Sequence, residues 1–341
     1  MGAQLVCCGS RSYPILQDRT CCSQLEWLGT TIPEWIAPSG DAEFGVTPGP
    51  DGNMHWSRGD GTQFKVRAGP NYASNGSKTA SAPAMYECVS VDIVRSSCIV
   101  SNVLGRLAMV DRPMDGIDWT PSCPLPRMFC IVATLPYTCD WSARLPSDDV
   151  NVDDPGCTVV SVHSITAETL RDLRSPEPSA RVRLFRDFVQ SAGGRCVPSA
   201  DKYTTGVLKG IAMCENVDDV AIPAMMRPMV RTYNGTPALI TKSGAVRKDP
   251  EGEWLEVNID VRVWSYAARS ALYNLRDYLP QAILHMGFVI QASEDDDLPE
   301  GIICACRLIA LDLVRSPVWI NDPRENRVGK LVPVGLVPAL N

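Results

Sequence analysis

The first eight residues are of the types that cells modify with fatty acids. The chain begins Met1-Gly2-Ala3-Gln4-Leu5-Val6-Cys7-Cys8. Removal of the initiator methionine would expose Gly2 to N-myristoylation, and the adjacent doublet of Cys7 and Cys8 is suited to palmitate. One acyl chain gives only marginal membrane binding, whereas two hold a protein on a bilayer. Because Val6 stands where the myristoylation pattern has Ser or Thr, an unmodified leader is the alternative interpretation.

Fourteen cysteines and three histidines offer many pairings for thiol catalysis or zinc, but their spacing supports neither. No C-x-x-C occurs, and apart from adjacent doublets the closest pair is Cys304-Ala-Cys306. The nucleophile elbow G-x-S-x-G, H-E-x-x-H, the P-loop and G-x-G-x-x-G are all absent. We therefore expect no metal, no cofactor and no catalytic residue. A Cys-dependent enzyme is the least favoured functional alternative.

Ionisable residues inside apolar runs are expected to have structural rather than catalytic roles. His285, in the run Ile283-Leu-His-Met-Gly-Phe288, is expected to be a hydrogen-bonded histidine of the core or of a strand edge. Glu256, Asp260 and Asp92 alternate with apolar residues in presumed strands, which predicts that they face solvent.

Composition and charge exclude several classes of protein. With 341 residues, 45% hydrophobic and 21% charged, the chain is typical of a globular fold. The net charge of −7 and the lack of a dense basic cluster argue against nucleic acid as a partner. Met1 to Ser10 does not resemble a secretory signal, and no run of about 18 apolar residues exists. We expect a cytoplasmic protein that is peripheral to a membrane if its amino terminus is acylated.

The sequence divides into three parts. Residues 1–50 are rich in Pro, Gly, Ser and Cys, which predicts a flexible leader. Residues 51–316 are predicted to form a single large domain, and residues 317–341 a tail. We found no internal repeat at a fixed period.

Within the domain, the spacing of apolar residues predicts an α+β fold with a mostly antiparallel sheet. Strands are predicted at Met128 to Leu135 and at Trp254 to Val261. Two more are predicted at Ile283 to Ile290 and at Cys306 to Leu313, on either side of an acidic turn near residue 295. Helices are predicted at Thr166 to Leu173, at Ala180 to Gln190 and, most strongly, at Trp264 to Tyr278. This long carboxyl-terminal helix is expected to pack its apolar stripe closely against the sheet.

Several short segments occur in one order along the chain. They are His55-Trp-Ser57, Phe64-Lys-Val-Arg67 with Tyr72, Val89-Ser-Val-Asp92, Met128 to Pro136, Gly235-Thr-Pro-Ala-Leu-Ile-Thr-Lys242, Trp254 to Asp260 and Asp297-Leu-Pro-Glu-Gly301. No single segment is decisive, but their order and spacing are hard to obtain by accident. Together they resemble one family, the C-terminal domain of the plant Enhanced Disease Resistance 2 proteins.

The chain departs from the family pattern at three places. Arg262-Val-Trp-Ser265 replaces Gly-Ser-Ser, His285 replaces an acidic residue, and Gln291 replaces a glutamate. In plant relatives the domain follows a pleckstrin-homology domain and a START domain, which implies lipid and membrane recognition. Here it is expected to stand alone. The family has no established catalytic residues, so the resemblance implies none.

The resemblance and the leader together predict a non-enzymatic module on the cytosolic face of a membrane, with a membrane or lipid as partner. A lipid cavity between the long helix and the sheet is one hypothesis, with Trp254, Trp264, Ala268 and Leu275 as its lining. A fully packed core is the favoured alternative to that cavity. A protein-interaction domain without any ligand is the second functional alternative, its partners unspecified.

Overall fold

The computed structural model describes residues 32, 34, 53–95, 100–106, 117–135, 156–191, 194–195, 207–241, 243–315 and 317–319. Gly2, Cys7 and Cys8 lie outside these residues. The described strands are β1 (His55–Arg58), β2 (Lys65–Arg67), β3 (Lys78–Ala80), β4 (Tyr86–Arg95), β5 (Met128–Leu135), β6 (Cys157–Ile165), β7 (Gly194–Arg195), β8 (Leu208–Cys214), β9 (Ala238–Leu239), β10 (Gly244–Lys248), β11 (Trp254–Asp260), β12 (Ile283–Ile290), β13 (Ile302–Ile309) and β14 (Val318–Trp319).

The described α-helices are α1 (Tyr72–Asn75), α2 (Val103–Arg106), α3 (Ala167–Leu173), α4 (Ala180–Ser191), α5 (Arg227–Tyr233) and α6 (Tyr266–Leu275). Short 3-10 turns include η1 (Gly61–Gln63), η3 (Val261–Val263), η4 (Arg276–Gln281) and η5 (Asp295–Asp297). Within the residues described, no helix has the length and apolar character needed to cross a membrane.

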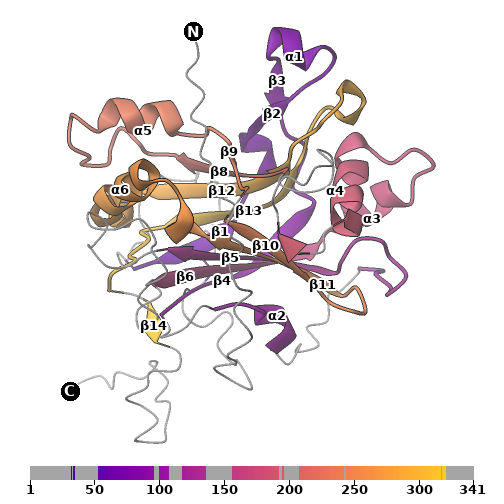
Figure 1. Cartoon of the computed structure of the whole chain (residues 1–341), viewed down its shortest axis with the longest axis horizontal. Coiled ribbons are helices and arrows are strands. Elements are labelled where there is room, and N and C mark those ends of the chain that lie inside the picture. Colours follow the sequence, from indigo (N-terminus) through magenta and orange to yellow (C-terminus); the bar gives the residue numbers. More distant parts are fainter. Residues whose placement is uncertain are drawn as a thin grey trace, which may run out of the picture.

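One large sheet organises the fold, and it curls into an open half-barrel (Figure 1). Its strands follow the order β7-β10-β11-β5-β6-β4-β13-β12-β8-β9, while β1 pairs with β13 and β14 with β4. The pairs β5–β11, β4–β13 and β4–β14 are parallel, and the other described pairs of this sheet are antiparallel. The predicted α+β class is confirmed, and the sheet is mixed.

Helices α3 and α4 fill the inner face of the sheet. Apolar residues recur along α4 at helical spacing, and Phe185 meets Tyr86 of β4 and Phe129 of β5 with ring centroids 5.6 Å apart in each case. The buried Tyr86 hydroxyl donates to the carbonyl oxygen of Pro126 at 2.7 Å. This aromatic cluster joins strands from the middle of the sheet to the helix that covers them.

The outer face is covered in separate patches. Helix α2 packs its buried Val103 and Leu104 over β5, β6 and β11. The β2–β3 hairpin forms a small sheet of its own and covers β8, β12 and β13. The two patches lie over different strands, so each can carry a site of its own.

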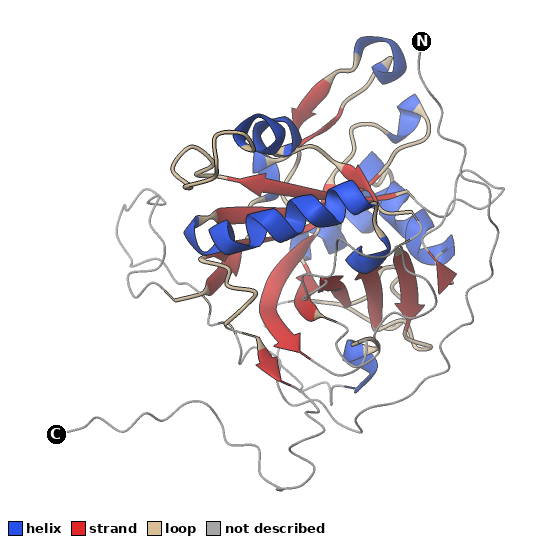
Figure 2. Ribbon diagram, turned by 60° about the vertical axis from the view of Figure 1, so that its left-hand side comes forward, coloured by secondary structure: helices blue, strands red, loops and turns tan. Residues whose placement is uncertain are grey.

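The prediction of a long carboxyl-terminal helix is wrong. Helix α6 has 10 residues, because Ser265 caps its start by accepting from the Ala268 N–H at 3.3 Å, and after Leu275 the chain tightens into η4. Figure 2 shows α6 on the outside of the molecule, in front of the strands. Arg269 is its one buried residue, and Tyr266 is 56% exposed, so the inner helix of this sheet is α4.

Candidate functional site

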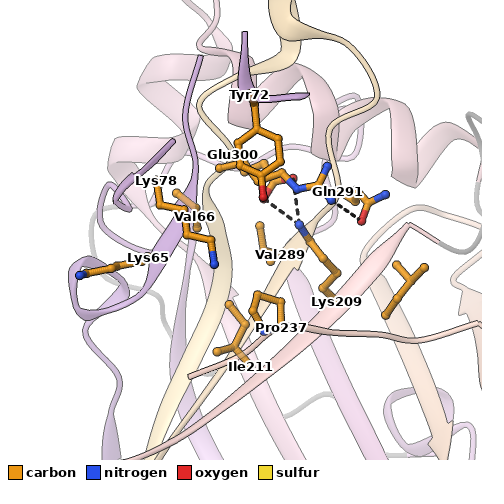
Figure 3. A pocket seen from close by; sticks show the side chains of 12 residues that line it. Lys65, Val66, Tyr72, Lys78, Lys209, Ile211, Pro237, Val289, Gln291 and Glu300 are labelled. Atoms are coloured by element: carbon orange, nitrogen blue, oxygen red, sulfur yellow. Dashed lines mark hydrogen bonds and ion pairs between the residues drawn. The ribbon is translucent and has the colours of Figure 1, made fainter. Parts of the chain in front are cut away.

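A pocket of about 210 Å³ lies between the β2–β3 hairpin and strands β8, β9 and β12 (Figure 3). It brings together side chains from both ends of the domain. We call it the basic pocket, and it is lined by Lys65, Val66, Arg67, Tyr72, Lys78, Lys209, Ile211, Pro237, Leu239, Val289, Gln291 and Glu300.

Phe64 fixes the hairpin onto the sheet. Its side chain is 2% exposed and packs on apolar residues of β8, β12 and β13. A Cβ added to Gly287 would lie 2.8 Å from Phe64 Cζ, so the ring occupies space that only glycine leaves free. Val66 is buried between Lys65 and Arg67, as strand alternation requires. The burial of Val66 thereby fixes at the pocket the strand that carries Arg67.

A buried ion pair forms the base of the basic pocket. Lys209 Nζ donates to both carboxylate oxygens of Glu300, at 2.9 and 2.8 Å. The N–H of Ala292 donates to Glu300 Oε1 at 2.9 Å. The Lys209 and Glu300 side chains are only 6% and 1% exposed. Since an unpaired buried charge costs several kcal/mol, each residue depends on the other.

Arg67 is held in one orientation above this pair. Its Nη2 donates to Gln291 Oε1 at 3.1 Å, and its Cζ lies 4.8 Å from the centre of the Tyr72 ring. Its Nε lies 3.7 Å from Glu300 Oε1. The guanidinium has five N–H donors, and these contacts place it over the pocket with donors to spare.

Positive charge exceeds negative charge around Glu300. Figure 3 shows the Lys78 side chain directed into the pocket and the Lys65 side chain directed away from Lys209. Burial lowers the pKa of Lys209; the Glu300 carboxylate opposes that shift, and the charges of Arg67 and Lys78 add to it. Arg67 and Lys209 therefore share the Glu300 carboxylate, and Lys78 adds a further positive charge to the same pocket. Such a cluster is suited to an anion with several acceptor oxygens.

A model of the family described as Protein ENHANCED DISEASE RESISTANCE 2, C-terminal, matches residues 56–312. The chain belongs to this family. No curated protein and no solved structure matches the chain.

Segments that carry the Enhanced Disease Resistance 2 resemblance converge on the basic pocket. Phe64 to Arg67 with Tyr72, Gly235 to Lys242, and Asp297 to Gly301 each contribute lining residues, although they are far apart in the sequence. Gln291, one of the departures from the family pattern, is the amide that accepts from Arg67.

Our sequence analysis missed this site. The outward positions of Lys65 and Arg67 beside Val66 are visible in a strand pattern, but Lys209 and Glu300 are separated by 91 positions. Nothing in the local sequence of either residue indicates the other. The pairing exists because β8 lies beside β12 and the chain turns back after β12 into β13.

The structure places the four predicted cavity residues in separate surroundings. Trp254 is buried on the outer face beneath α2, while Trp264 packs against the inner core and donates its Nε1–H to Ser243 Oγ at 2.9 Å. Ala268 is half-buried on α6. Leu275 belongs to another cluster, with Val220 and residues near α5. These residues do not meet around one space.

The expectation that Glu256 and Asp92 face solvent is wrong, since both are 0% exposed. Glu256 accepts from the N–H groups of Asn102 and Val103, each at 2.6 Å, and so satisfies donors at the start of α2. Asp260 is half-buried and accepts from the Arg262 N–H at 3.0 Å. Glu256 therefore keeps its place in the alternation of the strand, but its carboxylate caps a helix and does not contact solvent.

The expectation for His285 is confirmed. Its side chain is 2% exposed, and its Nε2 lies 2.8 Å from Glu215 Oε2. Arg307 Nε donates to the same oxygen at 3.1 Å. Burial lowers the pKa of His285, which favours the neutral ring.

Six of the seven thiols that the structure describes are poorly suited to nucleophilic catalysis. Burial raises the pKa of Cys88, Cys123, Cys130, Cys214 and Cys304, and that of Cys157 to about 12. A raised pKa leaves little thiolate, the reactive form, at neutral pH. No group of three or more metal-ligating side chains occurs among the residues that the structure describes.

His163 makes the fold sensitive to acid. Burial lowers its pKa from 6.5 to about 3, and its Nε2 lies 3.1 Å from Ser161 Oγ. As the pH falls below 6.5, the His163 ring binds a proton in the unfolded chain but not in the folded protein. The free energy of unfolding therefore falls by about 1.4 kcal/mol per pH unit until the pH reaches the folded pKa.

We expect His163→Gln to remove about 2 kcal/mol of the stability lost between about pH 7 and about pH 5. The measurement is urea unfolding of both proteins at the two pH values. Comparing the stability of each protein at the two pH values cancels the part of the effect of the substitution that does not depend on pH. Equal acid sensitivity of the two proteins would rule out His163 as its source.

Proposed function

We propose that this protein is a non-enzymatic module that lies on the cytosolic face of a membrane and binds anionic headgroups in the basic pocket. The observation that carries the proposal is the gathering of Arg67, Lys78 and Lys209 around a pocket whose lining has a single carboxylate, that of Glu300. A chain with a net charge of −7 has little general attraction to an anionic bilayer, so contact with such a membrane requires a local basic site.

The size of the pocket supports a headgroup as the ligand. Pockets that enclose a drug-sized ligand measure about 300–1,000 Å³. The basic pocket, at about 210 Å³, suits a charged headgroup whose acyl chains stay outside. Leu239 lines the pocket and is 44% exposed, which offers an apolar contact beside the cations.

Acyl groups on Gly2 and on Cys7 or Cys8 complete the proposal as a second attachment. A weak headgroup site and an acyl chain together hold a protein on a bilayer better than either does alone. The raised pKa values of the buried thiols support the non-enzymatic part.

We expect the full-length, unacylated chain to bind anionic vesicles and Lys78→Glu to weaken that binding. Reversing one charge removes about 2 kcal/mol, or roughly thirtyfold in the partition coefficient, at about 1 kcal/mol per charge near the surface. Co-sedimentation with phosphatidylcholine vesicles, with and without an anionic lipid, measures the effect. Binding should also fall as salt rises.

Arg247→Glu is the matched control. Arg247 is an exposed residue of β10, close to the opposite end of the strand order from β8 and β9, and it does not line the basic pocket. If both reversals reduce binding equally, the pocket has no special part in it. If no anionic vesicle binds the unmodified chain, the headgroup site is refuted and the protein-interaction alternative gains support. In cells, a Gly2→Ala reporter that stays on membranes would exclude myristate as the anchor.

A further inference from the structure

We infer that the basic pocket selects a terminal phosphate monoester over a phosphate diester. This inference rests on the proposed function and specifies its ligand. The shared chemistry is a doubly charged phosphate with three free oxygens, carried either by a lipid headgroup or by a soluble phosphate compound.

Charge favours the monoester. Lys209 and Glu300 neutralise each other at hydrogen-bonding distance, and the side chain of Lys65, the fourth basic lining residue, is directed away from Lys209 (Figure 3). The charges of Arg67 and Lys78 then remain, with no second carboxylate among the lining residues to balance them. A phosphate monoester carries about −1.5 to −2 charges at neutral pH, whereas a diester carries one. Only the monoester matches the two excess positive charges.

Donor geometry also favours the monoester. Arg67 and Lys78 are paired across the β2–β3 hairpin, whereas Lys209 lies on β8, so the donors approach from two sides of the pocket. Three terminal oxygens can accept from three such groups. In a diester, two oxygens are esterified, and the second substituent would have to fit into the same small space of about 210 Å³.

Gln291 is the residue that keeps the wall of the pocket neutral. Its Oε1 accepts from Arg67 Nη2 at 3.1 Å, and its side chain lines the pocket beside Glu300. Gln291→Glu has nearly the same shape and would retain this contact as an ion pair. It would also add a negative charge next to the incoming phosphate, and so reduce the excess positive charge to one.

The experiment uses the full-length protein and two pairs of probes. Titration calorimetry compares glycerol 3-phosphate, a monoester, with dimethyl phosphate, a diester. Co-sedimentation compares vesicles that contain phosphatidic acid with vesicles that contain phosphatidylglycerol. We expect the monoester of at least one pair to bind at least about tenfold more tightly than its diester, the effect of one charge-assisted hydrogen bond.

Gln291→Glu should weaken monoester binding at least about tenfold and leave diester binding less affected. Lys78→Gln should also weaken it, while Arg247→Gln should not. An unchanged unfolding midpoint for Gln291→Glu shows that the loss of affinity does not come from loss of the fold. If that midpoint falls, Lys78→Gln, on the exposed hairpin, provides the same test.

The outcomes separate this inference from the proposed function. Equal binding of phosphatidic acid and phosphatidylglycerol vesicles, both dependent on Lys78, overturns the monoester preference and leaves headgroup binding intact. Soluble monoester binding without vesicle binding supports the preference, assigns it to a free phosphate compound and refutes the membrane proposal. Monoester binding that Gln291→Glu and Lys78→Gln leave unchanged overturns the inference, as does failure of both monoester probes to bind.

Discussion

Glu300→Gln is expected to destabilise the protein by about 3–5 kcal/mol, the usual cost of removing one partner of a buried ion pair. Lys209, which is 5% exposed, would then be a buried charge without its carboxylate partner. Glutamine keeps an acceptor for the Ala292 N–H, so the loss reports mainly on the charge. Urea unfolding at neutral pH measures the free-energy difference.

The double variant Lys209→Met/Glu300→Leu is the control for this prediction. Replacing both ions of a buried pair by apolar side chains is often neutral or stabilising. We therefore expect the double variant to recover most of the stability and to lose anion binding. A double variant as unstable as Glu300→Gln would contradict an electrostatic origin of the effect.

Phe64→Ala is expected to cost about 3–5 kcal/mol, because it removes a fully buried ring and leaves a cavity. It should also weaken anion binding, since the ring anchors the hairpin that carries Arg67 and Lys78. Unfolding by denaturant and binding to anionic vesicles are the two measurements. A large loss of stability with unchanged binding would show that the hairpin does not need this anchor.

Gly287→Ala provides a matched test of the same contact. In the natural sequence its methyl group would meet the Phe64 ring at 2.8 Å, so the substitution should destabilise. In the Phe64→Ala background the methyl group enters the space that the ring has left. The cost of Gly287→Ala should shrink or change sign there, and purely additive costs would contradict direct contact.

Several elements could be predicted because their signal is local. The apolar run of β12 matches the prediction residue for residue, at Ile283–Ile290. Helices α3 and α4 begin and end within one residue of the predicted bounds, because apolar residues repeat at helical spacing and a proline-rich break separates them. The family assignment succeeded for a similar reason, since it depends on the order of short segments.

The errors concern where a correctly spaced element lies in space. The residues from Trp264 to Tyr278 have helical spacing, yet α6 stays on the outside while α4 occupies the inner face. Glu256 alternates as an exposed residue would, but α2 from a distant segment covers it and turns its carboxylate into a helix cap. The periodicity of a helix or strand shows that its two faces differ. It does not show which element covers each face.

Strand and helix periods could be predicted from neighbouring residues, because backbone geometry repeats over a few positions. The acidic charge balance follows from the composition of the chain, and the family from the order of its short segments. The basic pocket depends on the tertiary structure, because it exists only where β2, β8 and the turn before β13 meet. An ion pair between residues 91 positions apart depends on sheet order, and that order arises from the packing of the whole chain.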